Sequence, residues 1–302
     1  MTFNAEGMIK QGARITKETL FAAMANGDIL ESRALSFDSN KQLHFSLGEY
    51  EGIMPYEECA IGVRENEVRD IALITRVGRP VCFMITHIDE DAARVYLSRT
   101  MAQMRCSAEY LHTLSCGDVI PCRVTHIEQF GAFCDIGCGI SALVPIDCLS
   151  VSRIHSPHDR IRVGQDLRCV IKSIDCKGRF VLSLKELLGT WEENSARFSA
   201  GETVIGIVRS VENYGVFVEL TPNLAGLAEP NSALVPGQVV SVYIKSILPD
   251  KMKIKLVVLH VCDDDDFTFP IEYFSNAYHI DHWMYSVPGA AHMIETDFSQ
   301  DI

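Results

Sequence analysis

Two aromatic residues that flank a glycine are the side chains of this sequence best suited to binding chemistry. Phe130 and Phe133 stand on either side of Gly131 in the stretch IEQFGAFCDIG. A glycine within a strand pattern is typical of a bulge or a sharp bend. On a bent strand of a small barrel, exposed aromatic rings can stack on nucleobases, because every base offers a π-face. The same rings could instead belong to the barrel core, since aromatic residues are common in strands.

The stretch that contains these rings, residues 117–185, has the pattern of a small barrel. Short apolar blocks are separated by glycine-containing turns, and the stretch closes with the alternating run FVLSL. Alternation of this kind indicates strands, and five short strands fit into about seventy residues. The pattern therefore predicts one five-stranded barrel.

An internal repeat predicts a second copy of this barrel. The stretch GETVIGIVRSVENYGVFVEL, residues 201–220, repeats residues 117–136 at a constant offset of 84, and it places Tyr214 and Phe217 where Phe130 and Phe133 stand. Further along, IKSI recurs at an offset of 73, so eleven residues are missing opposite the irregular excursion at 146–163. A loop shortened between unchanged strands is a common difference between related barrels. The chain is thus predicted to be a tandem array.

Residues 28–105 show a weaker version of the same pattern. The blocks LHFSLG, GIMPYEE and VYLSR follow the order of the blocks in the central barrel. The aromatic–glycine–aromatic element has no clear counterpart, because His44 and Phe45 are adjacent and point to opposite faces of a strand. We expect a divergent barrel whose binding face is lost or repurposed.

Short helices and a C-terminal extension complete the predicted fold. Residues 1–27 form an N-terminal helical segment, with Thr16 as the N-cap of a helix that ends at Gly27. Thr190 and Glu193 have the spacing of a capping box. The predicted class is all-β, with tandem five-stranded barrels joined by short helices. The predicted domains are 1–27, a divergent barrel at 28–105, barrels at 116–186 and 200–260, and an acidic aromatic extension at 261–302 that packs against the third barrel.

Charge is unevenly distributed along the chain. The net charge is −13, but residues 261–302 hold nine acidic residues and no lysine or arginine. Residues 1–260 therefore carry 27 basic against 31 acidic residues, and residues 117–185 carry nine basic against seven acidic residues. A mildly basic central barrel is compatible with nucleic-acid binding.

Cysteine usage and hydropathy indicate a cytoplasmic protein. The eleven cysteines are scattered through apolar blocks, and no two have the C-x-x-C spacing of a zinc or redox site. Reduced structural thiols fit this pattern. No apolar run approaches eighteen residues, and the N-terminal stretch lacks an apolar signal core, so we expect no membrane association.

The sequence contains none of the common catalytic motifs. A nucleophile elbow, an H-E-x-x-H motif, a P-loop and a G-x-G-x-x-G motif are all missing. His279 and His282 have no further ligand pair nearby in the sequence, which is too few ligands for a metal site. We therefore expect no enzymatic activity, cofactor, metal or small-molecule substrate.

The repeated motif resembles the RNA-binding repeat named after ribosomal protein S-one, an OB-fold barrel. The resemblance lies in GDVIPCRVTHIEQFGAFCDIG from residue 117 and VGQDLRCVIKSIDCKGRFVLSLK from residue 163, and it covers about 75 residues of the second barrel and about 60 of the third. In that family, RNA contacts two aromatic residues, a histidine, and an aspartate–arginine pair before the last strand. The resemblance implies RNA-binding roles at these matching positions: Phe130, Phe133, Asp175 and Arg179 in the second barrel, and Tyr214, Phe217 and Lys253 in the third.

Several matching positions depart from the family pattern. The histidine position holds Pro145 in the second barrel and Glu229 in the third, and the aspartate position of the third barrel holds Pro249. Since Glu229 would repel a phosphate, the second barrel is the better candidate for RNA binding.

The resemblance implies a protein of translation. We expect it to bind single-stranded RNA, in particular mRNA, and to associate with the small ribosomal subunit through the first barrel. Two alternatives remain open: a protein-interaction scaffold on the ribosome or RNA polymerase, and a free regulatory RNA chaperone.

Overall fold

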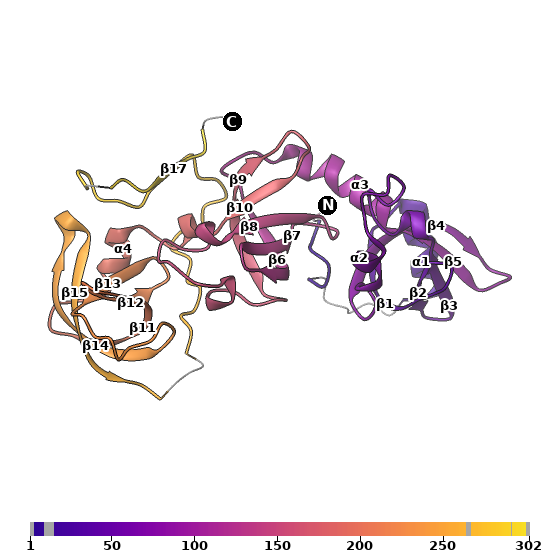
Figure 1. Cartoon of the computed structure of the whole chain (residues 1–302). Coiled ribbons are helices and arrows are strands. Elements are labelled where there is room, and N and C mark those ends of the chain that lie inside the picture. The colour runs from indigo at the N-terminus through magenta and orange to yellow at the C-terminus, as the bar shows by residue number, and fades with distance from the viewer. Residues whose placement is uncertain (1–2, 9–14, 264–266, 291, 300–302) are drawn as a thin grey trace. The chain divides into compact units, whose positions relative to one another are not determined.

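The computed structural model describes residues 3–8, 15–263, 267–290 and 292–299 (Figure 1). The acidic run that opens the predicted extension lies partly outside the described residues, at 264–266. Contacts divide the chain into two compact units. One comprises residues 1–114, 121–123 and 135–141, and the other comprises residues 115–120, 124–134 and 142–302. The domain boundaries expected from the sequence stay a prediction.

Three closed five-stranded barrels confirm the predicted all-β class. In each barrel the fifth strand inserts between the third and the fourth, and it runs parallel to the third. The strands of the first barrel are β1 Leu30–Phe37, β2 Leu43–Leu47, β3 Tyr50–Met54, β4 Pro80–Asp89 and β5 Arg94–Ser98. Those of the second are β6 Val119–Glu128, β7 Gly131–Asp135, β8 Ser141–Pro145, β9 Asp166–Ile174 and β10 Phe180–Ser183. Those of the third are β11 Thr203–Glu212, β12 Gly215–Thr221, β13 Leu224–Ala228, β14 Val239–Leu248 and β15 Lys253–Val261.

Alternating side chains create the barrel cores. Along β13, for example, Leu224, Gly226 and Ala228 are buried, whereas the residues between them are partly exposed. This period of two places one set of side chains inside the barrel and leaves the other on its outer face. A register shift interrupts the first strand of two barrels at matching places, between Ala34 and Ser36 in β1 and between Val208 and Ser210 in β11. The strand pair β1–β2 of the first barrel therefore has the same pairing pattern as the pair β11–β12 of the third barrel.

Short helices precede or follow the barrels as the caps predict. The helix α1 Lys17–Asn26 begins after Thr16, whose side chain accepts a hydrogen bond from the backbone of Thr19. The helix α4 Trp191–Ser195 begins after Thr190, which forms the predicted capping box with Glu193. The remaining helices are α2 Asp70–Ile74, α3 Arg99–Glu109, and the 3₁₀ turns η1 Tyr56–Glu58, η2 Leu111–Thr113, η3 Ile146–Cys148, η4 Pro157–Asp159, η5 Lys185–Leu187 and η6 Pro249–Lys251.

The irregular excursion at 146–163, a loop of the second barrel, packs against the third barrel. Arg160, which follows η4, donates to the Oε1 of Glu219 in β12 at 2.7 Å, and the side chains of both residues are fully buried. Arg209 of β11 donates to the other carboxylate oxygen of Glu219 at 2.5 Å. Two guanidinium groups therefore share one buried carboxylate, which compensates its desolvation.

The C-terminal extension packs against the second and the third barrel, whereas the sequence predicted packing against the third alone. Trp283 and Tyr285 are buried in the core cluster of the third barrel. Phe298 packs with Val170 and Leu187 of the second barrel. The two short strands of the extension, β16 His282–Met284 and β17 Glu295–Asp297, pair antiparallel, and β17 is labelled in the yellow C-terminal segment of Figure 1. The extension is thus a structural part of the compact unit that contains the third barrel.

A histidine in the extension is expected to make its attachment to the second barrel sensitive to pH. The hydrogen bond from the His279 ring to Asp118, 2.7 Å from its Nδ1, raises the pKa of this imidazole above its ordinary 6.5, and Asp281 lies 3.3 Å from its other nitrogen. Because the folded pKa is raised, the stabilisation is complete below pH 6.5 and is lost as the ring deprotonates at higher pH. Protease cleavage within residues 267–299 should therefore increase from about pH 6 to about pH 9, and a His279→Gln variant should show no such increase. Equal pH dependence in both proteins would contradict this assignment.

Candidate nucleic-acid interface

A transverse row of outward side chains crosses the five strands of the third barrel. In the third barrel, backbone pairing places five residues side by side. In the order of the strands they are Ser210, Phe217, Leu227, Lys255 and Ser246. The offset of 84 places His126, Phe133 and Leu143 at the first three of these positions in the second barrel. The predicted aromatic residue of β7 thus lies in the middle of an outer face.

Three rings lie together at one end of this row in the second barrel. Phe130, in the turn before β7, is 57% exposed, and its ring meets that of Phe133 edge-on with centroids 6.1 Å apart. The His126 ring stacks on Phe133 at 6.4 Å with an angle of 20° between their planes. Phe133 itself is half-buried. The predicted pair is brought together, and the third ring extends it into a platform.

The glycine between the two phenylalanines permits close contact between strands. A Cβ at Gly131 would lie 2.4 Å from the carbonyl oxygen of Val144 and 3.0 Å from the Cα of Pro145 in β8. Any side chain there would push β7 away from β8. The glycine thereby fixes the position of both rings against the neighbouring strand.

The predicted Asp175–Arg179 pair lies in the turn between β9 and β10. The Nε of Arg179 donates to Asp175 Oδ2 at 2.7 Å, and the backbone N–H groups of Lys177 and Arg179 donate to Oδ1. The backbone hydrogen bond from Arg179, followed by that from its side chain, lowers the pKa of Asp175. Asp175 therefore orders the turn, while the Arg179 side chain remains 75% exposed. In these contacts only Nε of the guanidinium is bound, so its terminal NH groups can donate to a phosphate.

The third barrel repeats the arrangement with different charges. Tyr214 is 67% exposed, and its ring meets that of Phe217 edge-on at 6.2 Å. Lys253 is exposed at the start of β15. Exposed Glu229 follows β13 directly. The aspartate position was wrongly assigned to Pro249: Lys253 pairs with Leu248, because the turn is one residue longer than in the second barrel.

The first barrel has a histidine where the other two barrels have a phenylalanine. His44 pairs with Ser36 across the register shift, as Phe217 does with Ser210, so it takes the place of that phenylalanine. Its ring nitrogens lie 3.1 Å from Asp38 and 3.0 Å from Glu51. Burial opposes charging of the ring, but the hydrogen bonds to both carboxylates outweigh it and raise the pKa of His44. The outer face of the first barrel, which the sequence predicts to be lost or repurposed for binding, carries one histidine between two carboxylates.

Two residues of these faces were not identified from the sequence. His126 reaches Phe133 from a neighbouring strand, and Lys255 lies beside Leu227 in the row that contains Phe217. The repeat offset and the alternation after Lys253 were the available signals. Neither signal shows which strands are neighbours, because the fifth strand inserts between the third and fourth.

No metal site or membrane-spanning helix is found in the parts of the chain that the structure describes. Within those ranges, no group of three or more His, Cys, Asp or Glu residues is arranged to hold a metal ion. No described helix is long and apolar enough to cross a membrane. All eleven cysteines are free thiols, and nine of them are partly or fully buried within the first two barrels and their connecting segments, where they are packing residues.

Comparisons with known proteins agree with this geometry. A family model described as the S1 RNA binding domain matches residues 114–185. The small ribosomal subunit protein bS1 of Staphylococcus aureus (strain COL) is 32% identical over 206 residues, which cover 63% of this chain and 52% of that protein. The bS1 protein of Staphylococcus saprophyticus is 33% identical over 198 residues, with 60% and 50% covered. The chain spans about half the length of these curated relatives.

Solved structures with related barrels superpose poorly over their whole length. A multidomain protein with nucleic acid binding domains from Streptococcus pneumoniae covers 78% of this chain and 74% of its own, at 16% identity and a TM-score of 0.26. GSP13 from Bacillus subtilis covers 24% of this chain and 55% of its own, at 24% identity and a TM-score of 0.23.

The matched domain coincides with the barrel that carries the three rings and the Asp175–Arg179 turn. Its relatives extend the similarity beyond that barrel to about 200 residues. Residues 114–185 therefore form an S1 RNA binding domain within a chain of three tandem five-stranded barrels, and about 200 residues of the chain are similar to the small ribosomal subunit protein bS1.

Proposed function

We propose that this protein binds single-stranded RNA through the outer face of the second barrel. The observation that carries the proposal is the platform of three rings, His126, Phe133 and Phe130, in the S1 RNA binding domain. Two or more bases stack on these rings, and the exposed guanidinium of Arg179 binds the backbone. Single strands are favoured because a paired and stacked base cannot present its face to a ring.

The third barrel extends the RNA track. Tyr214 and Phe217 offer a second stacking pair, and Lys253 and Lys255 lie on the same outer side of β15. Exposed Glu229 opposes this attraction, so the third barrel binds more weakly than the second. Asp175 acts by holding Arg179 in place rather than by touching RNA.

The ligand in the cell is mRNA, and the protein acts in the cytoplasm with the small ribosomal subunit. This part of the proposal is supported by relatives that are named small ribosomal subunit proteins. It assigns the chain a binding role without catalysis, cofactor or small-molecule substrate.

Salt-dependent fluorescence anisotropy tests the proposal. Unstructured single-stranded RNA should bind with an affinity that falls as salt rises, with a slope of about −0.7 for each phosphate contacted. A hairpin duplex of the same composition should bind more weakly, because its bases are unavailable for stacking. If the single strand and the duplex bind equally, or if neither binds, the proposed function is wrong.

Association with the ribosome needs a separate measurement. Co-sedimentation with purified small ribosomal subunits should show the protein in the subunit peak, and a large excess of unstructured RNA should not remove all of it. Full release by RNA would favour a free RNA chaperone.

A docking role for the first barrel is the second candidate, and a specific observation favours it. The position of the stacking phenylalanine is occupied by His44 between Asp38 and Glu51, and acidic groups repel phosphate. We propose that this barrel meets the ribosome through protein contacts. Loss of co-sedimentation in a chain lacking residues 1–105, with RNA affinity retained, would support this role.

A further inference from the structure

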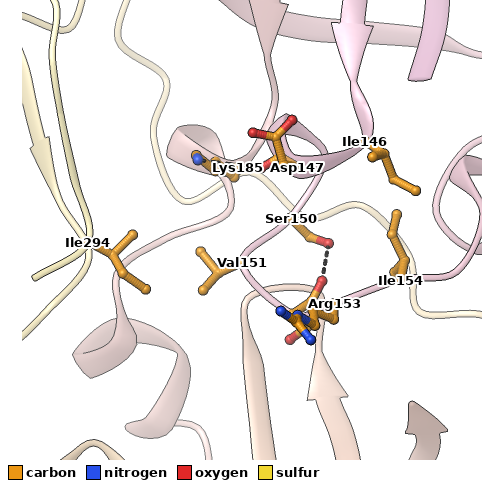
Figure 2. A pocket seen from close by; sticks show the side chains of 9 residues that line it. Ile146, Asp147, Ser150, Val151, Arg153, Ile154, Lys185 and Ile294 are labelled. Carbon is orange, nitrogen blue, oxygen red and sulfur yellow. Dashed lines mark hydrogen bonds between the residues drawn. The ribbon is translucent and has the colours of Figure 1, made fainter. Parts of the chain in front are cut away.

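A pocket beside the stacking face has the properties of a nucleotide subsite. It has a volume of about 270 Å³ and lies between the excursion of the second barrel and the C-terminal extension. Its size is just below the range of about 300–1,000 Å³ that is usual for drug-sized ligands, so it suits one nucleobase. Figure 2 shows the side chains that line it: Ile146, Asp147, Ser150, Val151, Ser152, Arg153, Ile154, Lys185 and Ile294.

The walls of the pocket are aliphatic and its polar groups are few. Ile146, Val151 and Ile154 of the excursion and Ile294 of the C-terminal extension line the space (Figure 2). Aliphatic side chains on several sides can bury the faces of a flat ring without competing for hydrogen bonds. The hydroxyl oxygen of Ser152 is buried and has no hydrogen-bond partner among the described residues, and a buried polar group of this kind can serve a ligand.

Two cations at the pocket are available for a phosphate. Arg153 is exposed, and none of the ion pairs between described residues includes it or Lys185. The Lys185 ammonium group donates to the backbone carbonyl of Asp147 at 3.4 Å, which leaves further donors free on the same nitrogen. Asp147 contributes one negative charge, so the lining carries a net charge of about +1.

The pocket lies next to the segment that carries the three-ring platform. Ile146 of the pocket donates its backbone N–H to the carbonyl of Phe130 at 2.9 Å. The preceding residue, Pro145, lies against Gly131 between the two phenylalanines. One lining residue of the pocket is therefore hydrogen-bonded directly to the residue that carries the exposed Phe130 ring.

The third barrel lacks the residues that form this pocket. Its loop is eleven residues shorter than the excursion at 146–163, which supplies Val151, Arg153 and Ile154. Docking to the third barrel uses other groups of the excursion, among them Arg160 and the backbone of Val151. Of the lining residues, Val151 and Ile294 also pack against the core of the third barrel, and Ser150 accepts a hydrogen bond from Arg160, whereas the side chains of Arg153 and Lys185 take no part in these contacts.

We propose that the pocket takes one unstacked base of the bound RNA, with Lys185 and Arg153 on the adjoining phosphate. The base next to the one stacked on Phe130 turns into the aliphatic space, and the RNA strand then continues toward the third barrel. This subsite rests on the proposed RNA binding and names the place where the track leaves the stacking face.

An oligoribonucleotide series with one 2-aminopurine tests the subsite. This base analogue is quenched when it stacks on aromatic rings, and it brightens in an aliphatic pocket. At one position of the series, binding to the wild-type protein should increase the emission. An Ile154→Trp variant, which fills the pocket, should remove that increase and weaken binding about tenfold. Ile205→Trp, at an exposed isoleucine of β11, is the matched control and should change neither.

Removing the positive charge of Lys185 provides an independent test of the subsite. Lys185→Gln should reduce the salt slope of binding by about 0.7, the contribution of one phosphate of a single strand. Lys17→Gln, at an exposed lysine of α1, should leave the slope unchanged. Thermal melts of all four variants should match the wild type, so that weaker binding reflects the subsite.

The outcomes separate the subsite from the proposed function. If RNA binds but no position brightens, or if Ile154→Trp behaves like Ile205→Trp, the subsite is wrong and the stacking platform stands. If the wild-type protein binds no RNA, the proposed function itself fails. A brightening that Ile154→Trp removes while the Phe130 contact is retained establishes the subsite.

Discussion

Replacing Phe130 and Phe133 together by alanine is expected to weaken binding of unstructured RNA by about 2–6 kcal/mol, because each stacked base contributes about 1–3 kcal/mol. Phe130 is more than half exposed, and Phe133 lies on the outer face. Stacking is lost with the rings, whereas the charge of the barrel does not change. The salt slope should therefore remain the same while the affinity falls at every salt concentration.

Matched variants show whether the loss belongs to this face. Tyr214→Ala with Phe217→Ala removes the same kind of pair from the third barrel, and it should cost less because Glu229 already weakens that site. His126→Ala should give an intermediate loss, since its ring extends the platform. Leu35→Ala, at an exposed leucine of the first barrel, should have no effect. Equal affinity of the double variant and the wild type would refute stacking on the second barrel.

Removing the charge of Glu219 is expected to have the largest effect on stability. Glu219→Gln leaves the buried guanidinium groups of Arg160 and Arg209 without their shared carboxylate. Breaking a buried ion pair by removing one partner typically costs about 3–5 kcal/mol. The free energy of unfolding measured by urea denaturation should fall by this amount. The loss should appear in the transition that unfolds the second and third barrels together.

An exposed glutamate on the adjacent strand supplies the control. Glu212→Gln makes the same change at an exposed position of β11 and should stay within about 0.5 kcal/mol of the wild type. Arg160→Met should cost less than Glu219→Gln, because Glu219 keeps Arg209 and the new side chain is apolar. If Glu219→Gln and Glu212→Gln were equally stable, the cluster would not hold the two barrels together.

The local pattern of the sequence predicted the barrels well. The period of two, the glycine turns and the repeat at an offset of 84 are properties of neighbouring residues, and they led to the correct strands in the second and third barrels. The caps at Thr16 and Thr190 depend on three residues each, and the structure confirms both. The two rings of Phe130 and Phe133 likewise come together, because Phe130 in the turn and Phe133 in β7 are only three residues apart and their rings meet edge-on.

The contacts missed by the sequence patterns join segments that lie far apart in the chain. Arg160 and Glu219 are 59 residues apart, and nothing in either segment marks the other as its partner. The same holds for the extension, whose Trp283 and Tyr285 complete a core assembled from residues of the third barrel. The aspartate position of the third barrel was misplaced by one residue, since a longer turn shifts pairing without changing composition.

By itself, the sequence determined the barrel type, its repetition, and the aromatic pairs on the second and third barrels, because these follow from alternation and turns within short segments. The tertiary structure decided which rings and cations share a face. It placed His126 on Phe133, Lys255 beside Leu227, and His44 between two carboxylates. It also placed a pocket next to Phe130. These neighbours depend on strand order, register and the docking of distant loops, and such contacts are set by packing across the barrel rather than by residues adjacent in the chain.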